Sequence, residues 1–137
     1  MQLGIVGLPA SGKTTIFRAL TGGSRSAGTP AGGGKLEVHT AVVDVPDSRL
    51  EALSVLYRPK KTVAAKVTYT DIGGIARKAK EPVHESLPAP LLNLLSQMDG
   101  LLQVVRAFED PNVAHPAGSV DPVRDLAALS SEFLLND

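Results

Sequence analysis

The segment GLPASGKTT at residues 7–15 limits the possible folds of this chain more than any other feature. It fits the pattern G-x-x-x-x-G-K-[ST], it follows the apolar run at residues 3–6, and Ile16, Phe17 and Leu20 come after it at helical spacing. The expected order is therefore a strand, a glycine-rich loop and a helix. In that arrangement backbone N–H groups and the positive end of the helix dipole converge, which makes a cradle for phosphate.

Two side chains of this loop have distinct expected roles. Lys13 would reach the outer phosphates of a nucleotide, and the Thr14 hydroxyl would bind Mg²⁺. A glycine-rich turn at a strand-to-helix joint is the plain alternative, but the complete pattern in this context favours phosphate binding. The predicted nucleotide-binding residues are Leu8, Pro9, Ala10, Ser11, Gly12, Lys13, Thr14, Thr15 and Gly74.

A second part of the same site is expected at the segment TDIGG. Asp71 ends a predicted strand at residues 63–72, and Gly74 follows three residues later, where its N–H could approach the γ-phosphate. The D-x-x-G pattern alone is weak, because many aspartates at strand ends only cap a turn. Next to a phosphate loop at the same edge of a sheet it is more specific. Thr14 and Asp71 are therefore the predicted metal ligands.

The rest of the chain alternates between strand and helix patterns. Further strands are expected at residues 39–45 and 100–108, the second as an apolar run typical of a strand buried on both faces. Helices are expected at residues 46–57, through 91–99 and at 123–137, the last with Val123, Leu126, Ser130 and Phe133 along one side. This order predicts an α/β fold with a parallel sheet flanked by helices.

Composition excludes several other classes of protein. The 137 residues include 14 basic and 14 acidic side chains, so non-specific binding to nucleic acid is not expected. There is no cysteine, hence no disulfide and no thiolate metal site, which fits the cytoplasm. No window reaches the roughly 18 apolar residues of a membrane span, so we expect a soluble protein. The histidines, including His115, are expected to be ordinary surface or loop residues.

Four segments together resemble the N-terminal part of the YchF-type, Obg-related P-loop NTPases. They are LGIVGLPASGKTTIFRALT, VVDVPDSRLEAL, TDIGG and VVRAFEDPNVAHPAGSVDPVRDL, and the last is the most specific. The resemblance implies a Ras-like nucleotide-binding domain over residues 1–137, with the first switch region at 22–38 and the second at 73–90. It also implies Mg²⁺, GTP or ATP as ligand, slow hydrolysis and association with the ribosome.

Some positions depart from what the resemblance implies. Lys35 stands where the first switch usually offers a threonine, and Ile75 stands where Ras-type enzymes have a water-orienting glutamine. An aliphatic side chain cannot hold water by hydrogen bonding, although the family shares this replacement. The chain stops at Asp137, about where the family's coiled-coil arm would begin. The base-recognition loop, the last strands and the C-terminal domain are therefore expected to be absent, which leaves a sheet edge open to self-association.

The sequence leaves three functions open. The first is nucleotide binding as part of a slow regulatory, translation-associated NTPase, and the second is a non-hydrolysing nucleotide-binding or interaction module. The third is a small-molecule kinase, because the loop sequence is also common in those enzymes. Kinases usually need arginines in a lid, and only Arg77 and Arg106 are candidates for that role here.

Overall fold

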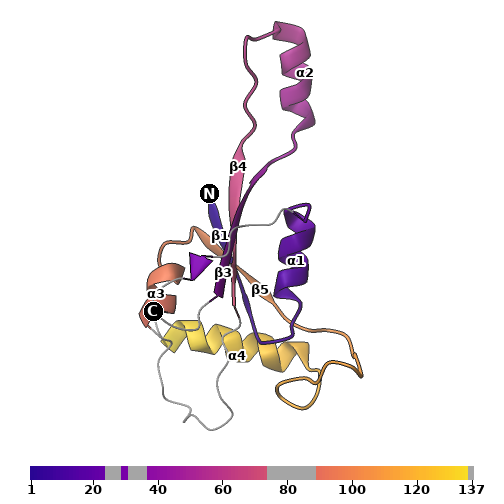
Figure 1. Ribbon diagram of the computed structural model, residues 1–137, viewed down its shortest axis with the longest axis vertical. Helices are drawn as coiled ribbons and strands as arrows, with labels where there is room; N and C mark the ends of the chain where they lie inside the picture. The colour runs from indigo at the N-terminus through magenta and orange to yellow at the C-terminus, as the bar shows by residue number, and fades with distance from the viewer. Residues whose placement is uncertain (24–28, 31–36, 74–88, 136–137) are drawn as a thin grey trace.

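A five-stranded sheet forms the centre of the part of the chain that the computed structural model describes, residues 1–23, 29–30, 37–73 and 89–135 (Figure 1). The strand order is β2-β3-β4-β1-β5. The strands are β1 (Gln2–Gly7), β2 (Thr29–Pro30), β3 (Glu37–Asp44), β4 (Lys66–Ile72) and β5 (Gly100–Val104). The helices are α1 (Lys13–Leu20), α2 (Ser48–Tyr57), α3 (Ala89–Leu95) and α4 (Pro122–Leu135). None of these helices is long and apolar enough to cross a membrane.

The sheet is mixed, so the prediction of a parallel sheet is wrong for two of its strands. Strand β1 pairs in parallel with β4 and β5, whereas β3 runs antiparallel to both β4 and β2. A parallel pair needs a crossover that packs across the sheet, but α2 has no buried residue and stands beyond the ends of β3 and β4 (Figure 1). The chain therefore returns along the neighbouring strand as a long hairpin, and we call its outer part, residues 45–65, the arm.

Local signals explain why α2 forms despite this exposure. The Asp47 carboxylate accepts a hydrogen bond from the backbone N–H of Arg49 at 2.9 Å, which caps the first turn. At the other end Arg58 adopts a left-handed conformation with φ of 45°, and its N–H donates to the carbonyl of Ser54. The predicted helix at residues 46–57 is thus confirmed, although it does not cover the sheet.

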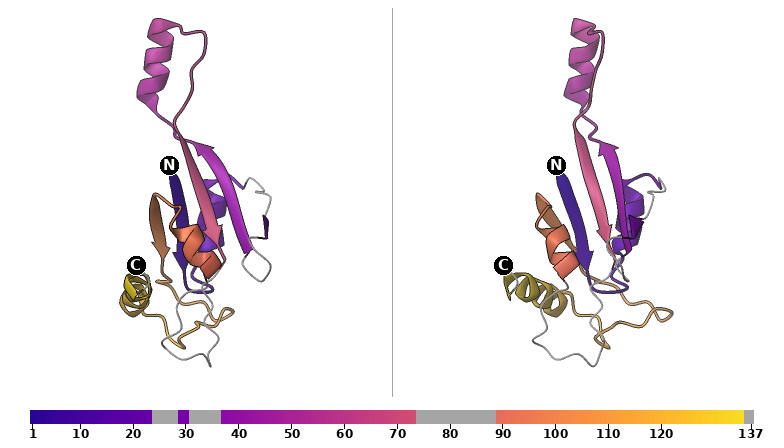
Figure 2. Two further views of the ribbon diagram at one scale, coloured as in Figure 1. Left: turned by 90° about the vertical axis from the view of Figure 1, so that its left-hand side faces the viewer. Right: turned by 60° about the vertical axis from the view of Figure 1, so that its left-hand side comes forward.

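The core lies on both faces of β1. Successive side chains of a strand point to opposite faces, and Ile5 and Val6 are both fully buried. On one face Ile5 packs with Phe17 of α1 and with Val104. On the other face Val6 packs with residues of β4, α3 and α4, namely Ile72, Leu91 and Phe133. Figure 2 shows α1 and α3 on opposite sides of the sheet.

Two burial predictions for the C-terminal part are wrong. Strand β5 lies at the edge of the sheet, where Leu101 and Leu102 are each 37% exposed, so it is not buried on both faces. The helix α4 forms as predicted, and Phe133 of the predicted face packs against the core, but Val123 is 78% exposed whereas Leu129, outside that face, is 3% exposed. Asp125 is also buried, and its ion pairs turn this face of the helix toward the preceding loop.

Gly7 is required by the close approach of β1 and β5. A Cβ atom at this position would lie 2.3 Å from the carbonyl oxygen of Val104, which is backbone and has little room to move. We expect Gly7→Ala to lower the free energy of unfolding by about 1–3 kcal/mol through overpacking, as measured by urea denaturation. Gly100→Ala is the matched control, because its Cβ would meet only the end of the Leu3 side chain at 3.2 Å. Equal stability of the two variants would contradict this account.

Candidate functional site

The loop between β1 and α1 has the backbone shape of an anion cradle. Gly12 has φ of 99° and Ala10 has φ of 60°, so both adopt the left-handed region and turn the chain sharply into the helix. Gly12 is the N-cap of α1, and no side chain caps the first turn. Its first N–H groups are therefore free of side-chain acceptors at the end where the helix dipole is positive.

Lys13 is held inside this loop. Its ammonium donates hydrogen bonds to the carbonyl oxygens of Gly7 at 3.0 Å and Leu8 at 2.7 Å, and the residue is 6% exposed. Desolvation by this burial lowers the pKa of Lys13, and the charge of the Asp71 carboxylate offsets part of the effect. A cation therefore lies in the loop, bound only to carbonyl groups that a phosphate could replace.

Thr14 and Asp71 lie together, as the sequence predicts. The Thr14 hydroxyl donates to Oδ2 of Asp71 at 2.8 Å, and the parallel register places Asp71 beside Ile5 on β1. Asp71 is 2% exposed, and its other oxygen, Oδ1, has no hydrogen-bond partner in the described part of the chain. A buried carboxylate oxygen without a donor, next to a hydroxyl, is a suitable ligand set for Mg²⁺.

A cavity of about 340 Å³ opens beside the loop. It is lined by Ala10, Gly12, Lys13, Thr14, Thr15, Arg106, Phe108, Asp110 and Val113. The loop residues supply the charged and polar wall, while Phe108 and Val113 supply an apolar wall from the segment after β5. This second wall was missed by sequence reasoning, although the segment follows a strand that ends at the same sheet edge as β1, where ligands of α/β proteins bind.

The remaining predicted site residues lie around this cavity or outside the described residues. Leu8 and Pro9 are half-buried at the start of the loop, and Thr15 is exposed on the cavity wall. Ser11 is buried, and its hydroxyl oxygen has no hydrogen-bond partner among the described residues. Gly74 falls outside the described residues, as do Lys35, Ile75 and Arg77 and most of the two predicted switch regions.

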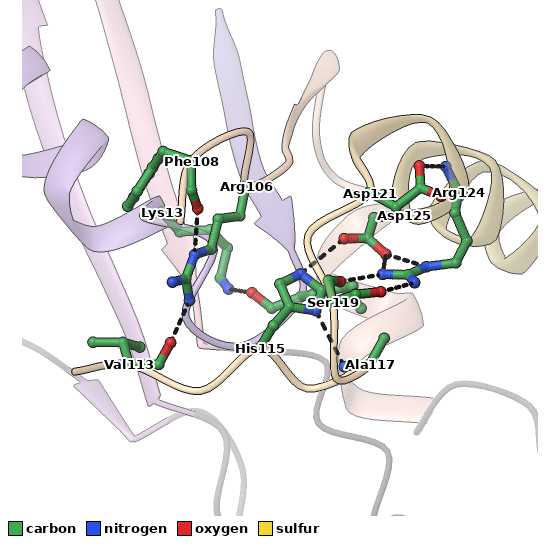
Figure 3. A network of polar contacts seen from close by, with 11 residues as sticks. Lys13, Arg106, Phe108, Val113, His115, Ala117, Ser119, Asp121, Arg124 and Asp125 are labelled. Carbon is green, nitrogen blue, oxygen red and sulfur yellow. Dashed lines mark hydrogen bonds and ion pairs between the residues drawn. The ribbon is translucent and has the colours of Figure 1, made fainter. Parts of the chain in front are cut away.

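Arg106 is bound to its own loop rather than placed in a lid. It is 3% exposed, and its guanidinium donates to the carbonyl oxygens of Phe108 at 3.0 Å and Val113 at 2.8 Å (Figure 3). It also donates to the carbonyl oxygen of Asp110 at 3.2 Å. The same group lies 5.3 Å from the centroid of the Phe108 ring, a cation–π contact. Arg106 therefore fixes the segment that forms the apolar wall.

His115 lies in a loop, as predicted, but its side chain is buried in a second polar network rather than exposed as that of an ordinary loop histidine. Its side chain is 5% exposed, Nδ1 accepts from the N–H of Ala117, and Nε2 lies 3.0 Å from Oδ2 of Asp125 (Figure 3). No hydrogen bond of good geometry reaches that oxygen from the described residues. Arg124 binds the same carboxylate and the carbonyl of Ser119. Together these contacts fasten the loop before α4 to the helix.

The strand, loop and helix, with a lysine inside the loop and a threonine–aspartate pair at its edge, define a P-loop nucleotide-binding domain. Residues 2–132 match the family described as 50S ribosome-binding GTPase. The chain therefore belongs to this family, and within it to the YchF and Obg-like branch, as the sequence resemblance predicts.

Relatives match the chain along its whole length. It is 42% identical to the ribosome-binding ATPase YchF of Bacillus subtilis, covering 100% of this chain and 37% of the relative. It is 39% identical to Obg-like ATPase 1 of Schizosaccharomyces pombe, covering 100% of this chain and 34% of that protein. The solved structure of the Schizosaccharomyces pombe YchF GTPase matches with a TM-score of 0.66 at 38% identity, over 100% of this chain and 36% of that one. The chain thus spans about a third of these relatives.

The burial of Lys13 has a consequence for stability at alkaline pH. Because its pKa in the folded chain is below the usual 10.5, the unfolded chain binds more protons between the two values. The free energy of unfolding therefore gains a contribution that rises with pH in that range. We expect the difference between wild type and Lys13→Met to shift in favour of wild type from about pH 8 to about pH 10, measured by urea denaturation without nucleotide. A constant difference would contradict the lowered pKa.

Proposed function

We propose that this chain binds a purine nucleoside triphosphate, GTP or ATP, together with Mg²⁺, as part of a slow regulatory, translation-associated NTPase. The single observation that carries the proposal is the buried Asp71 carboxylate, which is bonded to Thr14 through one oxygen and has no partner for the other among the described residues. It lies next to a loop that holds a lysine and offers backbone N–H groups. An anion and a hard cation together would satisfy all of these groups.

The chain's own residues would divide the work as follows. Loop N–H groups from Leu8 to Thr15 would hold phosphate oxygens, and Lys13 would exchange its two carbonyl acceptors for them. Thr14 and Asp71 would hold Mg²⁺, which when bound neutralises phosphate charge. Gly74, outside the described residues, completes the proposed set by donating its N–H. The switch regions at 22–38 and 73–90 remain part of the proposal.

We propose hydrolysis and ribosome association only for a protein of the full length that the relatives have, because this chain spans about a third of them. The matched relatives are named ATPases, and the Bacillus subtilis protein is named ribosome-binding. The aliphatic Ile75 gives no hydrogen bond to a water, which is consistent with slow turnover. We propose a cytoplasmic location on the same grounds, and self-association through the exposed edge at β5 stays a prediction.

Calorimetric titration with ATP, GTP and their diphosphates tests nucleotide binding directly. We expect saturable binding by wild type, and a loss of roughly ten- to hundredfold in Lys13→Ala, because one or two charge-assisted hydrogen bonds to phosphate are removed. Lys60→Ala is the matched control, since this lysine is exposed on the arm and outside the cavity. Equal affinity of Lys13→Ala and wild type would refute the proposed site.

Titration with and without Mg²⁺ tests the metal ligands separately. Asp71→Asn keeps the size of the side chain but removes its charge, so we expect the gain in affinity that Mg²⁺ gives to fall about tenfold. Thr14→Ser, which keeps the hydroxyl, should retain most of this gain, whereas Thr14→Val should lose it. If all three variants respond to Mg²⁺ as wild type does, Thr14 and Asp71 are not the ligands.

A further inference from the structure

Arg106 is a buried cation for which the described part of the chain offers no carboxylate. It is 3% exposed, and its recorded contacts are three backbone carbonyl oxygens and one aromatic ring. Burying an ionised group costs free energy unless hydrogen bonds and charges compensate for it. The hydrogen bonds are present, but no carboxylate of the described residues lies within ion-pair distance of the guanidinium. The free-energy cost of burying this arginine therefore suggests a role other than filling space in the core.

The three carbonyl groups show what the arginine organises. Two of them belong to Phe108 and Val113, the residues that form the apolar wall of the cavity, and the third belongs to Asp110 between them. The guanidinium also lies over the Phe108 ring at 5.3 Å, while 59% of Phe108 stays exposed. One planar group thus sets both the backbone of the wall and the position of its ring (Figure 3).

The apolar wall does not suit phosphate, which needs donors and positive charge. The phosphate part of the cavity is already supplied by the loop and Lys13. An exposed aromatic face beside it suits a flat, weakly polar ring, since bases stack on aromatic side chains. The two ends of the cavity therefore have the chemistry of the two ends of a nucleotide.

We propose that Arg106 is a positioning residue for the nucleoside half of the ligand. It acts by holding Phe108 and Val113 in the conformation that receives the base and ribose, without touching the phosphates. The proposal rests on the proposed function, because it assumes a nucleotide in the cavity. An arginine suits this role because its planar guanidinium uses three separate nitrogen atoms to reach the three carbonyl groups, whereas the three donors of a lysine radiate from a single nitrogen.

Binding of inorganic tripolyphosphate and of ATP or GTP separates the two halves of the cavity. In the full chain with Mg²⁺, we expect Arg106→Gln to bind ATP and GTP about tenfold more weakly, the order of loss when one base–aromatic stack is removed. Its affinity for tripolyphosphate should stay at the wild-type value. A merely structural role would weaken both ligands alike. Equal losses for nucleotide and tripolyphosphate would therefore overturn the proposal.

A double-mutant cycle tests whether Arg106 acts through the ring. Phe108→Ala should cause the same selective loss, and the double variant should lose no more than Phe108→Ala alone. Arg124→Gln is the matched control, because this arginine also binds a loop carbonyl but lies outside the cavity, and it should bind both ligands as wild type does. Additive losses in the double variant would overturn the proposal.

Two further comparisons keep the result decisive. If Arg106→Gln fails to fold, Arg106→Lys, which keeps the charge and loses the fork, takes its place with the same selective loss expected. Wild-type nucleotide affinity in folded Arg106→Lys would overturn the role of the fork. Failure of wild type itself to bind tripolyphosphate would instead refute the proposed function, which is a different outcome from the loss of selectivity.

Discussion

The parallel pairing of β1 with both of its neighbours is the constraint on which the site depends. On one side the register sets Ile5 beside Asp71, and on the other it sets Gly7 beside Val104. Parallel strands end at the same edge, so three chain segments far apart in sequence meet at the end of β1. They are the loop between β1 and α1, the buried Asp71 carboxylate and the segment with Arg106. Without this pairing each would be an isolated motif.

Polar groups that are costly to bury gather at this end of the sheet. Lys13, Asp71 and Arg106 are all at most 6% exposed, and two of these three side chains bind backbone carbonyl groups. Asp125, in the neighbouring network, is 2% exposed and pairs with His115 and Arg124. Buried charges need partners to be tolerated, and here those partners are mostly carbonyls of loops. The hydrogen bonds that these side chains donate to the loop carbonyls in turn hold the loops in place.

The sequence predicted what is local and missed what depends on distant packing. The loop at residues 7–15 and the helix at Ser48–Tyr57 follow from local spacing. The meeting of Thr14 with Asp71 also required the assumption that both strands end at the same edge of the sheet. The direction of β3 does not, because it depends on whether α2 packs across the sheet, and an apolar helix pattern indicates burial without saying where. Phe108 was missed because the whole apolar run at residues 100–108 was assigned to a strand, whereas β5 ends at Val104 and leaves Phe108 in the segment that follows.

The exposed arm affects how the chain unfolds locally. Helix α2 has ten residues and none is buried, and an isolated helix of that length is marginal in water. Its amides therefore depend on the caps at Asp47 and Arg58, and a hydrogen bond between the hydroxyls of Ser54 and Thr62 at 2.7 Å joins the helix to the segment that leads into β4. Such a unit is expected to exchange its amide hydrogens by local unfolding more readily than β3 and β4, which are paired without a break from Val38 with Ile72 to Asp44 with Lys66.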